Sequence, residues 1–206
     1  MMNIDLTNIG IIERDTFRDC SSLKSVSVDD NSSTKVNSKN TIDKKFIKQQ
    51  CDKGLLKNIV LPNSLTAIGN NAFSGCKSLE SVDIPANVVR IGTEVFMNCE
   101  NLNTIIFKDN TTGASMGKIV GEAMFLNCKS LKTVLLSNDI TAIETRAFYG
   151  CNSLKTIIVK RGIPPKLEDY VFPNLNIDIY VPQGCEKNYQ NAKGWSVYAS
   201  KIQPIS

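Results

Sequence analysis

The sequence predicts a repeat solenoid, in which short similar units stack side by side and share one core. The first observation is a motif of Phe, Cys and Leu at three-residue intervals. The second is a pair of apolar residues three and five positions after each Leu. The motif copies are Phe17-Cys20-Leu23, Phe73-Cys76-Leu79, Phe96-Cys99-Leu102, Phe125-Cys128-Leu131 and Phe148-Cys151-Leu154. One unit of about 23 residues cannot bury its own apolar face, so the units are expected to stack.

Each unit contains one short strand that is predicted to be buried on one side. After Leu79, the apolar residues Val82 and Ile84 alternate with polar residues, which is the pattern of a half-buried strand. Pro85 follows directly and ends the strand, because proline cannot donate a hydrogen bond to a neighbouring strand.

The segment after each strand is predicted to turn back on the outer side of the solenoid. The pairs Ala72-Phe73 and Ala147-Phe148 favour a short helical or 3-10 turn with the Phe inserted into the core. Gly69 and Gly92 fit positions at which the backbone turns tightly.

Two insertions interrupt the regular spacing. Inward strand residues such as Leu61 and Ile84 are 23 positions apart, whereas ten extra residues precede Leu61 and six precede Leu136. The insertions, near 29–55 and 109–118, are rich in Ser, Thr, Asn, Gly and Lys and are predicted to be surface loops.

A sixth, degraded unit is expected within the first insertion. Phe46 and Leu56 are interpreted as its apolar residues, and Cys51 is out of register with the other cysteines. Because the units are expected to stack in chain order, the strand of this unit should lie between the strands at Ser25 and Ser81.

The composition favours a continuous core and gives little sign of a charged partner. Apolar residues make up 42% of the chain, and the net charge is +4. Residues 29–57 contain seven Lys and four Asp, and this stretch is interpreted as a solvated loop because it lacks aromatic interleaving and helical register. No apolar run has transmembrane length, and residues 1–6 lack a signal-peptide pattern.

Five of the seven cysteines occupy the same position of the repeat. Equal positions of a solenoid form a column, so these residues are predicted to be buried, free and inert thiols. Disulfides between neighbouring units are possible, but the odd number of cysteines argues against a disulfide framework. No metal is expected, because the chain has no His and no C-x-x-C pair. Cys185 is expected to be exposed.

The end of the chain departs from the repeat. Residues 177–181 are predicted to form a final strand, and the aromatic residues Tyr189, Trp195 and Tyr198, with Ile202, are predicted to cover the open end of the core. The predicted organisation is a repeat array over 1–160, with about six units, followed by a final repeat and C-terminal cap over 161–206. Ile4 and Leu6 are expected to form a strand entering in mid-array, as in a piece of a longer protein.

The chain resembles a known repeat family. The segments Leu79-Glu-Ser-Val-Asp-Ile-Pro85 and Ile91-Gly-Thr-Glu-Val-Phe96-Met-Asn-Cys99, with the ending Ile179-Tyr-Val-Pro-Gln-Gly184, are similar to BspA-like (Treponema-type) leucine-rich repeats. The resemblance implies an α/β repeat solenoid, a right-handed horseshoe with a parallel sheet on the concave face and short turns or 3-10/helical segments outside.

The same resemblance implies a bacterial cell-surface or secreted protein. Several bacterial members act in adhesion to host proteins or to other cells, so the expected partner is a host or neighbouring-cell surface protein. The family has no catalytic motif to carry over to this chain. Neither a cofactor, nor nucleic acid, nor membrane insertion is expected.

Residues that alternate with the inward strand positions are predicted to face solvent on the concave side. One row is Ser25, Asn58, Ser81, Thr104, Thr133, Thr156 and Asp178, and the adjacent row is Ser27, Val60, Asp83, Ile106, Leu135, Ile158 and Tyr180. A contiguous apolar stripe exposed to water often marks an interaction site. The candidate binding residues are therefore Thr104, Ile106, Thr133, Leu135, Thr156, Ile158 and Tyr180.

Other interpretations of these rows stay open. Branched residues also suit an ordinary strand surface, and a threonine column gains cross-strand contacts without any ligand. The array could be a structural spacer or an intracellular interaction scaffold. An enzyme is disfavoured, because His is absent and no P-loop, dinucleotide-binding turn or nucleophile elbow occurs.

Overall fold

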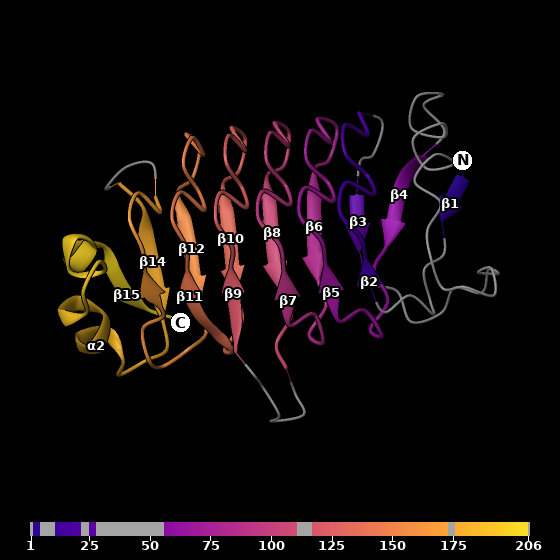
Figure 1. The fold of residues 1–206 in the computed structure, drawn as a ribbon. Helices are drawn as coiled ribbons and strands as arrows, with labels where there is room; N and C mark the ends of the chain where they lie inside the picture. Colours follow the sequence, from indigo (N-terminus) through magenta and orange to yellow (C-terminus); the bar gives the residue numbers. More distant parts are fainter. Residues whose placement is uncertain are drawn as a thin grey trace.

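The protein is a parallel β-solenoid in the computed structural model, which describes residues 2–4, 11–21, 25–27, 56–110, 117–172 and 176–205. One long strand per coil contributes to a nine-stranded main sheet in the order β1-β4-β3-β6-β8-β10-β12-β14-β15. These strands lie side by side along the array (Figure 1). They are β1 (Met2–Ile4), β3 (Ser25–Ser27), β4 (Leu56–Val60), β6 (Ser81–Ile84), β8 (Thr104–Phe107), β10 (Thr133–Leu136), β12 (Thr156–Val159), β14 (Asp178–Val181) and β15 (Ile202–Pro204). The predicted solenoid is confirmed.

Short strands form the other side of the solenoid. They make two three-stranded parallel sheets, β2-β5-β7 and β13-β11-β9. Their bounds are β2 (Ile11–Ile12), β5 (Ala67–Ile68), β7 (Arg90–Ile91), β9 (Lys118–Val120), β11 (Ile140–Ile143) and β13 (Lys166–Leu167). From β4 to β13, each coil therefore consists of a long strand, a short strand and the turns that join them.

The position of β4 differs from the prediction. The strand at Ser25 pairs with β4 on one side and with β6 on the other, so β4 does not lie between them. The Phe17 ring likewise stacks directly on Phe73, with 4.9 Å between ring centroids. The prediction of chain-order stacking is wrong here, because parallel pairing depends on matching strands and not on sequence separation. Phe46 and Cys51 of the expected sixth unit lie outside the described residues.

A stack of phenylalanine rings forms the centre of the core. Phe17, Phe73, Phe96, Phe125 and Phe148 are fully buried, and Phe172 continues the stack. Successive ring centroids are 4.9 to 5.7 Å apart, and the interplanar angles do not exceed 17°. Offset stacking at such distances is favourable in addition to the burial of apolar area. The repeated Phe therefore sets the spacing of the coils.

The turn around each Phe is not helical, in contrast to the prediction. The residues two before and two after the Phe have positive φ, for example Glu94 (55°) and Asn98 (59°) around Phe96. A 3-10 helix needs negative φ at every position. Because these residues have positive φ, the backbone N–H groups between them point along the solenoid axis toward the next coil. Phe96, for example, donates its N–H to the carbonyl of Met124 in the next coil at 2.8 Å. The same bond recurs from coil to coil.

Gly69 and Gly92 serve a purpose other than the predicted tight turn. Neither has a positive φ. A Cβ atom on Gly69 would lie 2.5 Å from the backbone nitrogen of Arg14, and one on Gly92 would lie 2.5 Å from that of Asn70. Glycine is required because the backbones of adjacent coils approach closely at these positions.

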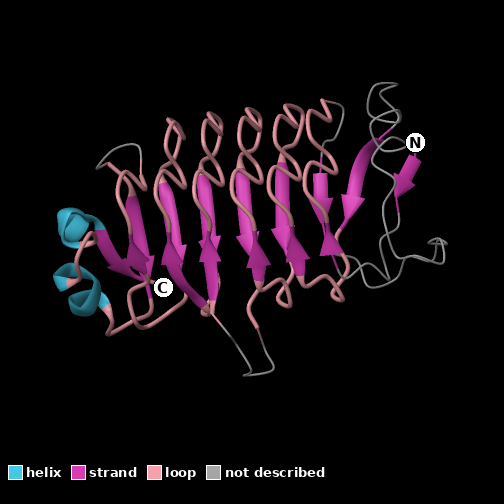
Figure 2. Ribbon diagram, in the orientation of Figure 1, coloured by secondary structure: helices cyan, strands magenta, loops and turns pink. Residues whose placement is uncertain are grey.

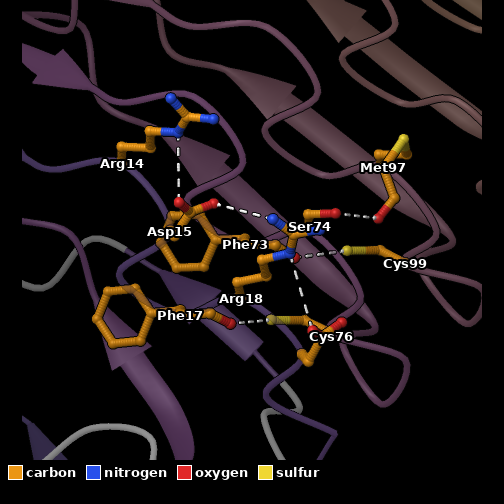
Figure 3. A network of polar contacts seen from close by, with 10 residues as sticks. Arg14, Asp15, Phe17, Arg18, Phe73, Ser74, Cys76, Met97 and Cys99 are labelled. Carbon is orange, nitrogen blue, oxygen red and sulfur yellow. Dashed lines mark hydrogen bonds and ion pairs between the residues drawn. The ribbon is translucent and has the colours of Figure 1, made fainter. Parts of the chain in front are cut away.

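Four thiols of the cysteine column form a second ladder beside the phenylalanine stack. Each is buried and donates its S–H to the carbonyl of the Phe in the preceding coil, and Figure 3 shows two of these contacts. The bonds are Cys76 to Phe17 (3.0 Å), Cys99 to Phe73 (3.2 Å), Cys128 to Phe96 (3.2 Å) and Cys151 to Phe125 (3.1 Å). These cysteines therefore satisfy buried carbonyl groups.

Cys20 is an exception to the predicted column of free thiols. It is buried, but it is disulfide-bonded. Cys185 is free and partly exposed, close to the expectation for that residue.

Aromatic side chains close the C-terminal end of the core, as predicted. The helices α2 (Glu186–Asn191) and η1 (Ser196–Lys201) lie at this end, coloured cyan in Figure 2. Trp195 is fully buried, and its ring centroid lies 6.0 Å from that of Phe172. Its indole N–H donates to the carbonyl of Pro165 at 2.7 Å. Tyr189 donates to the carbonyl of Arg161 at 2.6 Å. The main sheet continues through β14 and β15, and the division at residue 160 stays a prediction.

Replacement of one core ring tests the importance of the stack. Phe96→Ala is expected to lower the free energy of unfolding by about 3–5 kcal/mol, because it leaves a cavity between Phe73 and Phe125. Tyr149→Ala is the matched control: this side chain is 50% exposed, and a change within about 0.5 kcal/mol is expected. Urea unfolding measures both, and equal effects would contradict the described core.

Burial of the thiols predicts a pH dependence of stability. Desolvation raises the pKa of Cys76, Cys99 and Cys128 above the ordinary value of 9.0. The unfolded chain then releases these protons at a lower pH than the folded chain, so stability is full below pH 9 and falls above it. The slope is up to about 1.4 kcal/mol per pH unit for each thiol. Urea unfolding between pH 7 and 10 should show a smaller decline for the triple alanine variant, and parallel declines would refute this explanation.

Candidate binding surface on the main sheet

The predicted candidate residues lie in register on the outward side of the main sheet. Thr133 pairs with Thr104 on one side and with Thr156 on the other, and Leu135 pairs with Ile106 and Ile158. Tyr180 pairs with Ile158 and continues the row. We call Ile106, Leu135, Ile158 and Tyr180 the apolar stripe, and Thr104, Thr133 and Thr156 the threonine row.

Alternating burial explains why these side chains share one face. In β8, β10, β12 and β14 the first and third residues are partly exposed, and the second and fourth are buried. Successive side chains of a strand point to opposite faces, so the inward Val and Ile residues fix the outward direction of their neighbours. The hydrophobic core thus determines which residues a partner can reach.

The apolar stripe is less exposed than expected. Its four side chains are only partly exposed, and none of them belongs to the group of large, widely exposed apolar residues. Neighbouring parallel strands are about 4.8 Å apart, so adjacent side chains of the row cover one another's flanks. The stripe is therefore a continuous, low apolar surface and not a set of projecting side chains.

Lysines border the stripe on both sides. Lys132 and Lys155 precede β10 and β12, are exposed and have no ion pair with the described carboxylates. At the other ends of the strands, Lys108 pairs with Asp83 at 2.8 Å and Lys160 pairs with Asp109 at 2.5 Å. Both ion pairs are solvent-accessible and contribute little to stability. The free positive charge therefore lies on the side of the threonine row.

Asp109 connects three neighbouring coils near the ends of strands β8, β10 and β12. Its Oδ2 pairs with Lys160, and its Oδ1 accepts the backbone N–H of Asn138 at 3.2 Å. Arg161 donates to the carbonyl of the same Asn138 at 3.3 Å. The predicted loop at 109–118 begins from this network, although residues 111–116 lie outside the described part of the chain.

The changed strand order alters the N-terminal part of the two rows. Asn58 and Val60 pair with Ser25 and Ser27, and Ser25 pairs with Ser81. The apolar stripe itself is unaffected, since it lies on β8, β10, β12 and β14. The sequence missed the ninth strand, β15, in which Gln203 pairs with Tyr180 and ends the stripe.

A groove lies on the short-strand side of the solenoid. It has a volume of about 690 Å³, runs along β2, β5, β7 and β9 and is lined by the exposed Ile11 and Ile119, by Arg90 and by the backbone of Gly69 and Gly92. The groove is lined by acidic residues, Glu13 and Glu144, and by basic residues, Arg14 and Arg90. This mixed charge does not favour a partner of either sign.

The described residues contain neither a cluster of metal ligands nor a helix that could span a membrane. No group of three or more His, Cys, Asp and Glu side chains in this part of the chain could hold a metal ion. Its helices are also too short or too polar to cross a bilayer.

Sequence reasoning missed a buried ion pair in the solenoid interior, between the coils of β9 and β11. The side chains of Lys118 and Asp139 are 0% and 3% exposed, with 3.4 Å between Nζ and Oδ2. Ser137, also fully buried, donates to Asp139 Oδ1 at 2.5 Å. Burial lowers the pKa of Lys118 below its ordinary value of 10.5, against the opposite effect of Asp139. The polar composition of the 109–118 insertion predicts a surface position for Lys118, although its spacing from Val120 is that of an inward strand residue.

Comparison with known families identifies the repeat. The model of the BspA type leucine rich repeat region, in six copies, matches residues 1–115 and 42–178. The chain belongs to the BspA-type leucine-rich repeat family. No curated protein sequence matches it. The match covers the motif copies that form the phenylalanine stack and the thiol ladder, and it ends at residue 178, before Tyr180 of the apolar stripe.

Solved structures similar to this BspA-type chain are also leucine-rich repeat proteins. One from Eubacterium ventriosum is 30% identical over 55% of this chain, with a TM-score of 0.46. A leucine rich cell surface protein from Faecalibacterium prausnitzii is 19% identical over 94% (TM-score 0.38), and a protein from Bacteroides ovatus is 17% identical over 98% (TM-score 0.44). This chain spans 28%, 63% and 60% of those chains, respectively.

Proposed function

We propose that this chain is a non-catalytic protein-binding module of a bacterial cell-surface or secreted protein, acting in adhesion. The apolar stripe and the threonine row bind an extended segment of a protein on a host or neighbouring cell. The observation that carries the proposal is the stripe itself: four neighbouring coils place Ile, Leu, Ile and Tyr in one row on an open sheet.

The arrangement of this surface suits an extended polypeptide. The apolar stripe provides continuous area whose burial favours association, at roughly 25 cal/mol per Å² before the costs of binding. The threonine hydroxyls run beside it and can accept hydrogen bonds from the peptide groups of a partner; the Thr104 hydroxyl itself donates to Asn103 Oδ1. Tyr180 offers an aromatic side chain, a residue type enriched among those that dominate binding energy.

The charge at the border favours an acidic partner. Lys132 and Lys155 are exposed on adjacent coils and lack ion pairs with the described carboxylates. Complementary charge at the rim of an interface mainly accelerates association and selects the partner. We therefore expect the bound segment to carry Asp or Glu beside its apolar residues.

Two features support a location outside the cytosol. Proteins of the BspA-type repeat family are commonly surface repeat proteins, and Cys20 is disulfide-bonded. Disulfides persist mainly in oxidising surroundings such as the cell surface. The competing function is a spacer within a larger protein, in which the outward residues of the main sheet bind nothing.

Replacement of the stripe distinguishes a binding module from a spacer. The variant Ile106→Asp/Leu135→Asp/Ile158→Asp is expected to lose binding to an array of purified host and bacterial surface proteins, because it places three charges in the apolar contact. The matched control, Ile11→Asp/Ile119→Asp/Ile163→Asp, changes exposed apolar residues elsewhere and should retain binding. Circular dichroism checks that both variants fold. Failure of the wild-type chain to bind, or equal binding by the stripe variant, would contradict the proposal.

Charge reversal at the rim tests the chemistry of the partner. Lys132→Glu/Lys155→Glu is expected to slow association by about tenfold at low salt, with a smaller difference at high salt. Lys187→Glu/Lys193→Glu changes the net charge equally in the C-terminal cap and serves as the control. Surface plasmon resonance with a partner found on the array measures both rates. Equal slowing by the two variants would show that only net charge matters.

A further inference from the structure

The buried pair of Lys118 and Asp139 joins two neighbouring coils. Lys118 begins β9, and Asp139 immediately precedes β11, the strand beside it. The backbone N–H of Lys118 donates to the carbonyl of Asp139 at 2.8 Å, so the two residues are fixed opposite each other. Their side chains both lie in the interior of the solenoid, at 0% and 3% exposure.

As an ion pair, this contact is poorly satisfied. Lys118 Nζ lies 3.4 Å from Asp139 Oδ2. This distance allows an ion pair, but Oδ2 has no hydrogen-bond partner. Among the described residues, Nζ donates a hydrogen bond to the carbonyl of Lys108, which is also long at 3.4 Å. Removal of two charges from water costs several kcal/mol per ion unless close hydrogen bonds compensate. A buried, unsatisfied polar atom of this kind needs a separate explanation.

We propose that Lys118 and Asp139 form an intramolecular amide bond in the folded protein. Nζ of Lys118 passes one proton to Asp139 Oδ2 and then, as a neutral amine, attacks Cγ of the carboxyl group. The new N–C bond forms, the C–Oδ2 bond breaks, and Oδ2 leaves as water with its own proton and one from the amine. No oxidant, cofactor or second protein is required, since the reaction is a condensation.

The surroundings of the pair favour this reaction. Burial lowers the pKa of Lys118 and so increases the fraction of neutral, nucleophilic amine. Ser137 donates a hydrogen bond to Oδ1, the oxygen that becomes negative during the attack. Oδ2, the leaving oxygen, is held by no hydrogen bond. The backbone hydrogen bond holds Lys118 and Asp139 opposite each other. The reaction therefore does not pay the entropy cost of bringing two separate reactants together.

The product satisfies the polar groups better than the ion pair does. The amide oxygen keeps the hydrogen bond from Ser137, and the remaining N–H faces the carbonyl of Lys108. No buried charge is left. The bond would also join the end of the 109–118 insertion covalently to the next coil, so that the base of this loop could not separate from the solenoid.

Intact mass spectrometry of the full chain, after denaturation and reduction, tests the proposal. The expected mass is that of the sequence minus one water molecule, and a peptide map should contain a branched peptide that joins Lys118 to Asp139. The full sequence mass for protein kept folded, or a water loss located at other residues, would overturn the proposal. The wild-type chain alone decides the question, even if no variant folds.

Two substitutions sharpen the result. Lys118→Arg is expected to restore the full mass, because the guanidinium group does not condense with the carboxyl. Lys160→Arg is the control: Lys160 and Asp109 are closer, at 2.5 Å, but both are solvent-accessible, so their peptides should be unlinked in every sample. A persistent water loss in the Lys118→Arg protein would contradict the assignment.

Discussion

The regular stacking of one coil on the next is the constraint on which the rest of the structure depends. It acts through the buried phenylalanine rings and through the hydrogen bonds between the turns that hold them. A turn can point its amides along the array only if residues on both sides of the Phe adopt positive φ, as Glu94 and Asn98 do. Aromatic packing and backbone hydrogen bonding therefore require the same spacing between coils. A coil without the ring contact would leave a cavity, and a coil without the hydrogen bonds would leave backbone polar groups unpaired.

This spacing also determines the outer surface. Because the inward residues of each long strand are held at one level of the core, the outward residues form straight rows across many coils. A single apolar residue such as Leu135 would be unremarkable on a strand; the same position filled on four successive coils makes a continuous surface. The repeat supplies a frame of fixed geometry, and a few outward side chains, with lysines at the border, give it chemical character.

Much of this surface could be predicted from the sequence, because alternation with period two assigns each strand residue to a face. The position of β4 could not, since its local pattern does not state which strand it joins. The conformation of the turns was also missed, although Asn and Gly at the second position after the Phe, as in Asn98 and Gly150, are residues that tolerate positive φ. The pair of Lys118 and Asp139 was hidden because each side chain looks like part of a surface loop until both coils are in place.

Photo-crosslinking tests the central claim, that the outward side of the main sheet binds a protein partner. A photoreactive side chain at position 135, in the middle of the apolar stripe, would be compared with one at position 119, an exposed apolar position on the short-strand side. Each protein would be irradiated on intact host cells and on neighbouring bacterial cells. The account predicts a covalent protein adduct from position 135 and none from position 119. Adducts from position 119 alone, or equally from both positions, would contradict it.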